Sequence, residues 1–358
     1  MTNGKEFSAH ELVERHRALD VLLREQRSAF LSDWNGTHPF FEQFLGSELR
    51  RFAPGATAGE YIFLDERSAV TEAIRSFHKN AESLELQPAN ILAGSGSSLL
   101  LNAFVWWLAK SNHRKVYYIP PLYHSLHYFL SLLNITPIPV SNTHAFDSSF
   151  ELSLPDRPSV LLLCDPVWFA GKHVPLELIK IIAAWQQRTG SLIMVDGSFQ
   201  YLNWDDTRSE QTSCLDVERT FRLVCPTKAL AIHAYRFAYL LHPASFHDDL
   251  TFLYESVSGG FDVGDLIFGL RALEVLSSSP GNRPLAAFLR NTFQALVRQK
   301  VLKTSIEPDC GYFVFAIPLA PLPNQVMMTQ EYFQLTGYPH YGRVNLMVAR
   351  QLYLDRQR

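Results

Sequence analysis

Short apolar runs alternate with longer amphipathic stretches from about residue 90 onward. The runs SVLLLCDP (159–166), SLIMVDGSF (191–199) and RTFRLVCPT (219–227) are apolar on both faces, which is typical of strands in a sheet covered on both sides. PLELIKIIAAWQQRTG (175–190) has the spacing of a helix and ends in glycine, a common helix stop. The pattern predicts an α/β fold with a mostly parallel sheet between helices.

The pattern changes after about residue 260. A long helix is predicted to begin in DVGDLIFGLRALEVL, and the strand candidates GYFVFAIPL and GRVNLMVA follow it. We therefore predict an N-terminal arm (1–50) that forms part of a small domain, a large domain (51–260) and a smaller C-terminal α+β domain (261–358).

Composition narrows the class of protein. The 358 residues carry a net charge of −3, and 47% of them are hydrophobic, which is ordinary for a soluble globular protein. Lysine and arginine form no stripe, so no nucleic acid is expected as a partner. No apolar run is long enough to span a bilayer, and the polar N-terminus is unlike a secretory signal, so we expect a cytoplasmic protein without a membrane partner. The four cysteines lack CxxC or CxH spacing, so neither a disulfide framework nor a metal site is predicted.

Several distinctive residues follow the predicted strands, where ligands gather in such sheets. The turn GSGSS (94–98) opens a helix and presents backbone N–H groups to an anion. Tyr123 offers an aromatic face, Asp196 ends one strand, and Lys228 and Arg236 follow the next. Each has an ordinary structural interpretation: a tight turn, a helix cap, a lysine whose charge reaches solvent or an arginine in an ion pair. As an ordered set they fit a ligand with a phosphate, an aromatic ring, a ring nitrogen and a reactive carbonyl, which are the features of pyridoxal 5′-phosphate (PLP).

From about Tyr61 to Arg343 the sequence resembles the fold-type I PLP-dependent enzymes, in particular the class I/II aminotransferase superfamily. The resemblance implies a PLP-dependent transferase fold with a large and a small domain. It implies that Lys228 is the Schiff-base lysine and the catalytic base, and that Asp196 pairs with the pyridine nitrogen. It also implies that Arg343 grips the substrate α-carboxylate.

The resemblance implies further contacts with the cofactor. The phosphate group is expected to be held by Gly96, Ser97, Ser98, Thr227 and Arg236. Tyr123 is expected to stack on the ring. Tyr61 would reach the phosphate of a neighbouring subunit, which implies a homodimer with a shared active site.

The sequence departs from this superfamily at three positions. The usual asparagine donor to the cofactor's phenolic oxygen O3′ is replaced by Trp168, in DPVWFAG (165–171), and the usual tyrosine donor by Phe199. Cys225 replaces a serine that contacts the phosphate. These changes retain the lysine, the aspartate and both arginines, so PLP binding is still expected, whereas ordinary transamination is less firmly implied.

Three functions follow from these observations. The favoured one is a specialised PLP enzyme that eliminates, replaces or cyclises at Cβ or Cγ of an L-amino acid in a biosynthetic pathway, as the capreomycidine- and enduracididine-type cyclases do. The alternatives are an ordinary amino-acid aminotransferase with a keto-acid acceptor and a PLP-binding protein without catalysis. Asp33 and Glu42 could meet a cationic, arginine-like substrate, although isolated acids near a turn are more often surface charges. The identity of the amino acid does not follow from the sequence.

Overall fold

The computed structural model describes residues 68–355 except 148, 206, 208, 261, 323 and 324, together with residues 11, 15, 18, 19, 30–32 and 40. The predictions for Tyr61, Asp33 and Glu42 fall outside the described residues.

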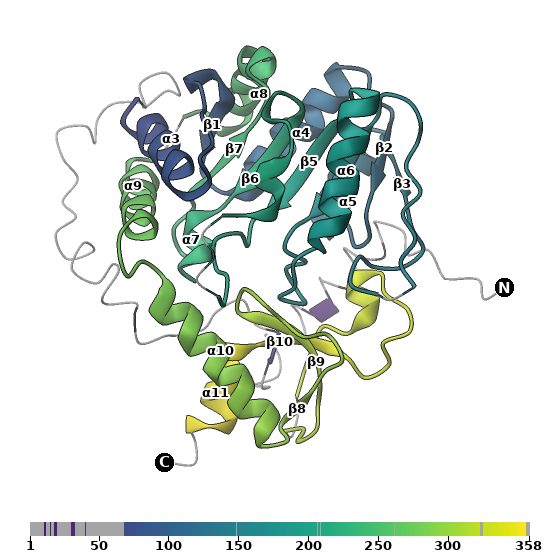
Figure 1. The fold of residues 1–358 in the computed structure, drawn as a ribbon, viewed down its shortest axis with the longest axis vertical. Coiled ribbons are helices and arrows are strands. Elements are labelled where there is room, and N and C mark those ends of the chain that lie inside the picture. Colours follow the sequence, from purple (N-terminus) through teal and green to yellow (C-terminus); the bar gives the residue numbers. More distant parts are fainter. Residues whose placement is uncertain are drawn as a thin grey trace.

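A seven-stranded sheet forms the centre of the large domain, in the order β1-β7-β6-β5-β4-β2-β3 (Figure 1). Strand β7 runs antiparallel to β1 and β6, and the other neighbours are parallel. This confirms the predicted α/β fold with a mostly parallel sheet. The strands are β1 (Ile91–Gly94), β2 (Lys115–Tyr118), β3 (Thr136–Pro139), β4 (Val160–Cys164), β5 (Leu192–Gly197), β6 (Thr220–Val224) and β7 (Ala238–Leu241).

Helices cover both faces of this sheet because successive strand residues point to opposite sides. Leu162 and Met194 face one apolar cluster, whereas Leu161 and Ile193 face another. The first face packs against α4 (Ser97–Lys110), α5 (His124–Leu132) and α8 (His247–Ser258). The second packs against α3 (Ser68–Glu82), α6 (Leu176–Thr189) and α9 (Val263–Ser277). The buried strands therefore account for the continuous apolar runs of the sequence.

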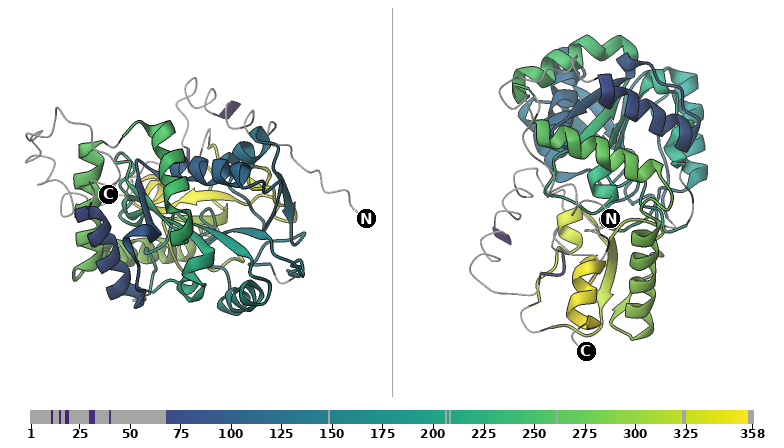
Figure 2. Two further views of the ribbon diagram at one scale, coloured as in Figure 1. Left: turned by 90° about the horizontal axis from the view of Figure 1, so that it is seen from above. Right: turned by 90° about the vertical axis from the view of Figure 1, so that its left-hand side faces the viewer.

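A small domain lies beside the carboxyl ends of the parallel strands (Figures 1 and 2). Its sheet has the order β10-β9-β8, and helices α10 and α11 pack against each other. Phe30 forms an isolated bridge with Val326, so the described part of the N-terminal arm joins this domain. The elements are α10 (Arg283–Arg298), β8 (Leu302–Lys303), β9 (Phe313–Pro318), β10 (Gly342–Asn345) and α11 (Leu346–Tyr353).

Two details differ from the sequence predictions. The segment GRVNLMVA is a strand only to Asn345, whose side chain accepts hydrogen bonds from Met347 N and Val348 N and begins α11. Helix α9 packs on α3, whereas α10 leads into the small sheet. We therefore propose that the domains divide between α9 and α10 and not at residue 261.

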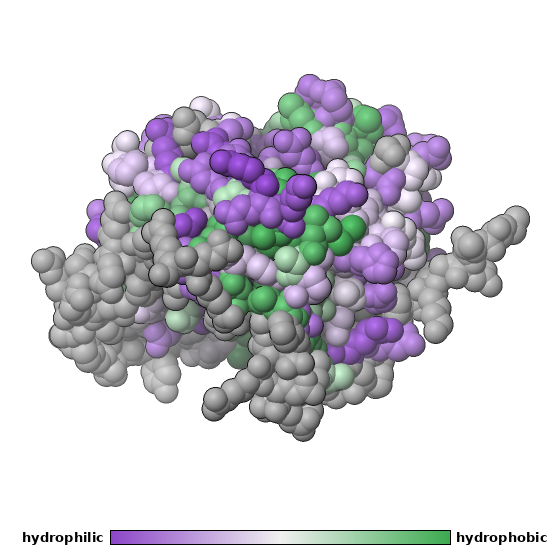
Figure 3. Space-filling model, turned by 90° about the horizontal axis from the view of Figure 1, so that it is seen from below, coloured by the Kyte–Doolittle hydropathy of each residue, from purple (hydrophilic) through white to green (hydrophobic). Residues whose placement is uncertain are grey.

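Among the described residues, no helix combines the length and the apolar character needed to cross a bilayer. Val297 and Leu319 are exposed apolar residues of the small domain. Figure 3 views the molecule from below Figure 1, and there the visible apolar residues lie among hydrophilic ones.

Candidate active site

Asp196 and Lys228 come together because their strands are neighbours. Asp196 lies near the carboxyl end of β5, which pairs in parallel with β6. Lys228 lies on α7 (Pro226–Ala229), a short helical turn directly after β6, and so is just beyond the strand end that the sequence indicated. Asp196 is 8% exposed, and its Oδ1 accepts hydrogen bonds from Ser198 N (3.2 Å) and Ser198 Oγ (2.6 Å). A local turn therefore fixes a buried carboxylate at the end of β5, next to the strand that leads to Lys228.

The Lys228 ammonium group faces apolar neighbours. Its Nζ lies 4.9 Å from the ring centroid of Phe199. Burial raises the pKa of the nearby Cys225 thiol, and the positive charge of Lys228 acts in the opposite direction. A cation above an aromatic ring is attracted to its face, so Phe199 helps to hold the Lys228 side chain in place.

The GSGSS turn and Arg236 form a cradle at the N-terminus of α4. Gly96 has φ +94°, and a Cβ built there would lie 3.0–3.2 Å from the guanidinium atoms of Arg236, so glycine lets the arginine pack against the turn. Ser97 and Ser98 begin α4, whose N-terminal N–H groups face the same way. A small pocket lies here, and its lining includes Gly96, Ser97, Thr227, Lys228, His233 and Arg236.

Residues outside the predicted set hold this cradle in place. The Arg236 backbone N–H donates to Asp265 Oδ1 at 2.8 Å, from the first turn of α9. Tyr254 Oη, from α8, accepts from Ser95 N at 2.7 Å. Thr227, which belongs to the predicted set, also contributes, because its Oγ1 donates to the Phe237 carbonyl at 3.3 Å. The sequence carried no signal for Asp265 or Tyr254, because their roles arise only when α8 and α9 dock.

Aromatic residues line the side of the site that faces the small domain. Tyr123 lies at the start of α5, and its ring meets that of Trp168 edge-on at 6.1 Å. Trp168 and Phe199 stack at 6.4 Å with an interplanar angle of 23°, and both are buried. The two positions that lack the usual O3′ donors therefore form one apolar wall.

Arg343 lies on β10, next to this apolar wall. It is fully buried, and its Cζ lies 5.2 Å from the Trp168 ring and 4.4 Å from the Phe313 ring. Its Nη2 donates to the Ser32 carbonyl, and Ser32 Oγ donates to the Arg343 carbonyl at 2.5 Å. These contacts orient the guanidinium group from the small domain towards Trp168.

Tyr312 also lies at this wall and escaped the sequence analysis. Its ring centroid lies 5.4 Å from that of Phe199 and 5.3 Å from that of His233. The side chain is fully buried, and its hydroxyl has no hydrogen-bond partner in the described structure. Tyr312 stands in an apolar strand segment, where a core aromatic residue is the ordinary interpretation, so the sequence did not single it out.

Three polar side chains, those of Gln200, Tyr201 and His233, are candidates to replace the missing O3′ donors, and they face different ways. Tyr201 Oη donates to Glu82 Oε1 at 2.9 Å, and Gln200 Nε2 donates to Thr212 Oγ1 at 2.8 Å. Both side chains are therefore engaged with other groups. His233 instead lines the pocket with Lys228 and Arg236.

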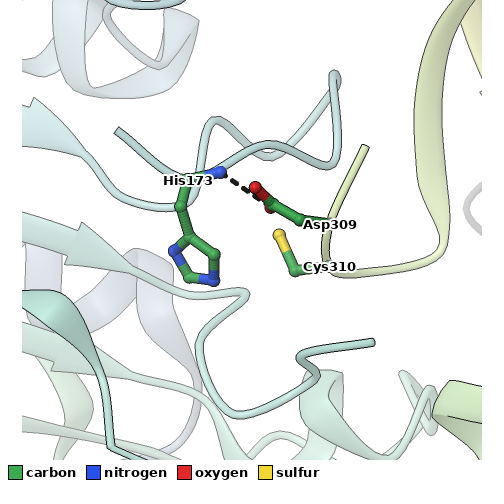
Figure 4. Close-up of side chains that lie close together, drawn as sticks. All are labelled: His173, Asp309 and Cys310. Carbon is green, nitrogen blue, oxygen red and sulfur yellow. Dashed lines mark hydrogen bonds between the residues drawn. The ribbon is translucent and has the colours of Figure 1, made fainter. Parts of the chain in front are cut away.

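A second cluster of ionisable groups joins the two domains (Figure 4). His173 N donates to Asp309 Oδ1 at 3.0 Å, and the thiol of Cys310 lies beside the His173 ring. Asp165 Oδ1 is 3.3 Å from His173 Nδ1, and burial raises the pKa of the neighbouring Glu210 to about 7. The ligand atoms of His173, Asp309 and Cys310 lie within 4.8 Å of one another, as do those of Asp165, His173 and Glu210. His173 nevertheless has a hydrogen-bond partner at each ring nitrogen, since Nε2 lies 2.8 Å from Asn203 Oδ1, so we interpret the cluster as a structural link.

Comparisons with known proteins agree with this architecture. The N-succinyldiaminopimelate aminotransferase of Mycobacterium tuberculosis aligns over 92% of both chains, with a TM-score of 0.75 and 14% identity. An aspartate aminotransferase of Thermotoga maritima aligns over 97% of this chain and 96% of its own, with a TM-score of 0.74 and 14% identity. A methionine aminotransferase of Escherichia coli aligns over 92% of both chains, with a TM-score of 0.71 and 13% identity. At such identities the likeness shows the fold. No curated protein sequence matches the chain.

The mostly parallel sheet with helices on both faces is that of the fold-type I PLP-dependent enzymes. The sequence matches the family "Aminotransferase class I and II" over residues 47–300, which is more than half of the chain. The chain therefore belongs to the class I and II aminotransferase family, and its cofactor is PLP.

Proposed function

We propose that the protein acts at the α-amino group and Cα of an L-amino acid, with PLP bound covalently to Lys228. The observation that carries this proposal is the convergence of Lys228, Asp196 and the Gly96–Arg236 cradle around the strand ends of one sheet. When bound, PLP supplies a carbonyl that condenses with amines and a ring that accepts electrons.

The residues present fit this cofactor. The Arg236 guanidinium and the N-terminus of α4 offer charge and N–H donors to a phosphate. Buried Asp196 is suited to hold a proton on a ring nitrogen, because a carboxylate favours the protonated form of a nearby base. Lys228, as a free amine, is suited to remove a proton from substrate Cα and return one.

The substrate carboxylate is assigned to Arg343. A buried guanidinium with two donor edges matches a carboxylate in geometry and charge. The surrounding Trp168 and Phe313 rings keep water away, which strengthens such a pair. A homodimer with a shared site, in which Tyr61 serves the neighbouring subunit, is part of the same proposal and rests on the family resemblance.

Two reactions use these residues. Amino-group transfer to a keto acid is supported by the family and by the named activities of the similar structures. The second candidate is specialised elimination, replacement or cyclisation at Cβ or Cγ. The feature that favours it over plain transfer is the apolar Trp168–Phe199 wall, which lacks the usual O3′ donors. An arginine-like substrate depends on Asp33 and Glu42, outside the described residues.

A panel of L-amino acids, incubated with holoenzyme in the presence and absence of a keto-acid acceptor, separates these reactions. Amino transfer that requires the acceptor supports transamination, and product formed without the acceptor supports the specialised reaction. If no amino acid changes the cofactor absorbance, the protein binds PLP without catalysis and the proposed function is wrong.

A further inference from the structure

The hydroxyl group of Tyr312 stands out among the buried polar groups of the site. The side chain is 0% exposed, and its Oη has no hydrogen-bond partner in the described structure. A buried hydroxyl without a partner loses its hydration and gains nothing in return, so native structures rarely retain one without a reason. The Tyr312 ring lies 4.7 Å from that of Phe313, which in turn lies 4.4 Å from Arg343 Cζ.

The backbone around Tyr312 is held from both domains. Gly311 N donates to the Leu202 carbonyl at 2.8 Å, and Leu346 N donates to the Tyr312 carbonyl at 2.9 Å. The neighbouring Asp309 N donates to the Gly171 carbonyl at 2.8 Å. The ring itself packs against Phe199 and His233. Little freedom remains for the hydroxyl to turn towards another acceptor, so its position is preset before any ligand arrives.

The electrostatic environment indicates which kind of group the hydroxyl would meet. Burial raises the pKa of Tyr312 well above its usual range, so the hydroxyl keeps its proton and is available as a donor. The positive charge of the Arg343 guanidinium acts in the opposite direction and favours a lower pKa of the Tyr312 hydroxyl. The Tyr312 hydroxyl proton cannot be accepted by Arg343, because arginine has only donors. A group that satisfies both must be an acceptor, and the charge of Arg343 makes an anion the favoured one.

We propose that Tyr312 donates a hydrogen bond to the α-carboxylate of the amino-acid substrate that Arg343 attracts. This inference rests on the proposed function, and it makes Tyr312 a second recognition residue for the carboxylate. Arg343 supplies the charge from β10, and Tyr312 supplies a neutral donor from the segment before β9. In the apolar wall of Trp168 and Phe199, the indole N–H of Trp168 is the one side-chain donor that could also reach a carboxylate.

The test compares holoenzymes carrying native Tyr312 or Tyr312→Phe. Binding is measured from the change in cofactor absorbance with three matched pairs: L-phenylalanine and phenethylamine, L-arginine and agmatine, and L-alanine and ethylamine. We expect Tyr312→Phe to weaken binding of the responding amino acid about tenfold or more, the range for a hydrogen bond to a charged group. Binding of the matching amine, which lacks the carboxylate, should change less than twofold. Tyr353→Phe, which removes a hydroxyl that donates to Gln325 on the small domain, is the matched control and should leave both unchanged.

Two further measurements separate this role from others. The ligand-free Tyr312→Phe holoenzyme should have the same Tm as the parent or a slightly higher one, because the lost hydroxyl had no partner. A clear drop in Tm would show a structural bond and overturn the inference. If Tyr312→Phe changed the pH titration of cofactor absorbance in the absence of amino acid, the hydroxyl would contact the cofactor and not the substrate. That result would also overturn the inference.

Failure of the inference can be told apart from failure of the proposed function. If the native holoenzyme responds to an amino acid and Tyr312→Phe binds that amino acid equally well, only the role of Tyr312 is wrong. If the native holoenzyme responds to none of the three amino acids and carries no reducible link at Lys228, the proposed function is wrong and this inference falls with it.

Discussion

The two sides of the site are built in different ways. On the side proposed to bind the cofactor (the cofactor side), Asp196, Lys228 and Arg236 follow adjacent strands or pack on a glycine turn, so the sheet itself brings them together. On the side proposed to bind the substrate (the substrate side), Trp168 and Arg343 come from a loop of the large domain and a strand of the small domain. The first side depends on local strand-end geometry, whereas the second depends on how the domains dock. A substitution on the first side should therefore affect mainly its own contacts. A substitution on the second side should also disturb the packing between the two domains.

The largest effect is expected on the cofactor side, from Lys228→Ala. Loss of the only amine assigned to both covalent attachment and proton transfer should lower turnover at least about 10³-fold. Borohydride reduction followed by peptide mapping should find pyridoxyl label at Lys228 in the parent protein and none there in the variant.

Lys172→Ala is the matched control for this prediction. Lys172 Nζ pairs with Asp309 Oδ2 at 2.9 Å, at the junction between the domains. Its removal should leave the label on Lys228. Label on Lys172 or Lys115 in the parent protein would contradict the whole assignment.

On the substrate side, Arg343→Ala should leave PLP bound and weaken amino-acid binding by about 2–5 kcal/mol, the range for breaking a buried charge pair. Arg343→Lys should recover little, because an ammonium group does not reproduce the planar fork. Absorbance titration of each holoenzyme with the responding amino acid measures both effects. An alanine variant that binds as tightly as the parent would show that another residue holds the carboxylate.

The stability of the protein should depend on pH through Glu210, which lies in the ionisable cluster that joins the two domains. Its pKa is raised from 4.5 to about 7, so the folded protein holds a proton that the unfolded chain releases between these values. The contribution of this group to stability is therefore fully present below pH 4.5 and is lost as the pH rises through 7. The loss amounts to at most about 3 kcal/mol.

Glu210→Gln tests this expectation because its side chain carries no titrating proton. Denaturant unfolding at pH 5 and pH 8 should show a smaller decline in stability for this variant than for the parent. Glu177→Gln, which alters an exposed ion pair with Lys180, is the control and should preserve the parent's decline. Equal declines for the parent and Glu210→Gln would mean that Glu210 is ionised in the folded protein.

The smallest effect should come from Phe199→Tyr, which adds a polar group to the apolar wall. If the new hydroxyl reaches O3′, it should stabilise the anionic oxygen and lower the pKa of the cofactor-linked Lys228 nitrogen by about one unit, or about 1.4 kcal/mol. The parent should keep that nitrogen protonated well above neutral pH. A spectrophotometric pH titration of both holoenzymes checks this, and deprotonation of the parent near pH 7 would mean that another group, with His233 as the remaining candidate, already donates to O3′.

The cofactor side could be predicted from the sequence because strand ends, glycine turns and charged residues in apolar surroundings leave a local signal. Asp196 and Lys228 are examples. The substrate side could be predicted only in part. Arg343 was identified through the family resemblance, but Tyr312 resembles any core aromatic residue until the domains are docked. Asp265, likewise, gains its role only where α9 meets Arg236.

The contacts between Ser32 and Arg343 also bear on the order of folding. They join residues 311 positions apart, so the intervening chain must be brought into place before they can form. Closing so long a loop costs conformational entropy that local contacts do not incur. The cofactor side, built from sequence neighbours and adjacent strands, can thus form early. Arg343 reaches its final orientation only when it meets Ser32, so the carboxylate recognition proposed for it would be one of the last properties that the folding chain acquires.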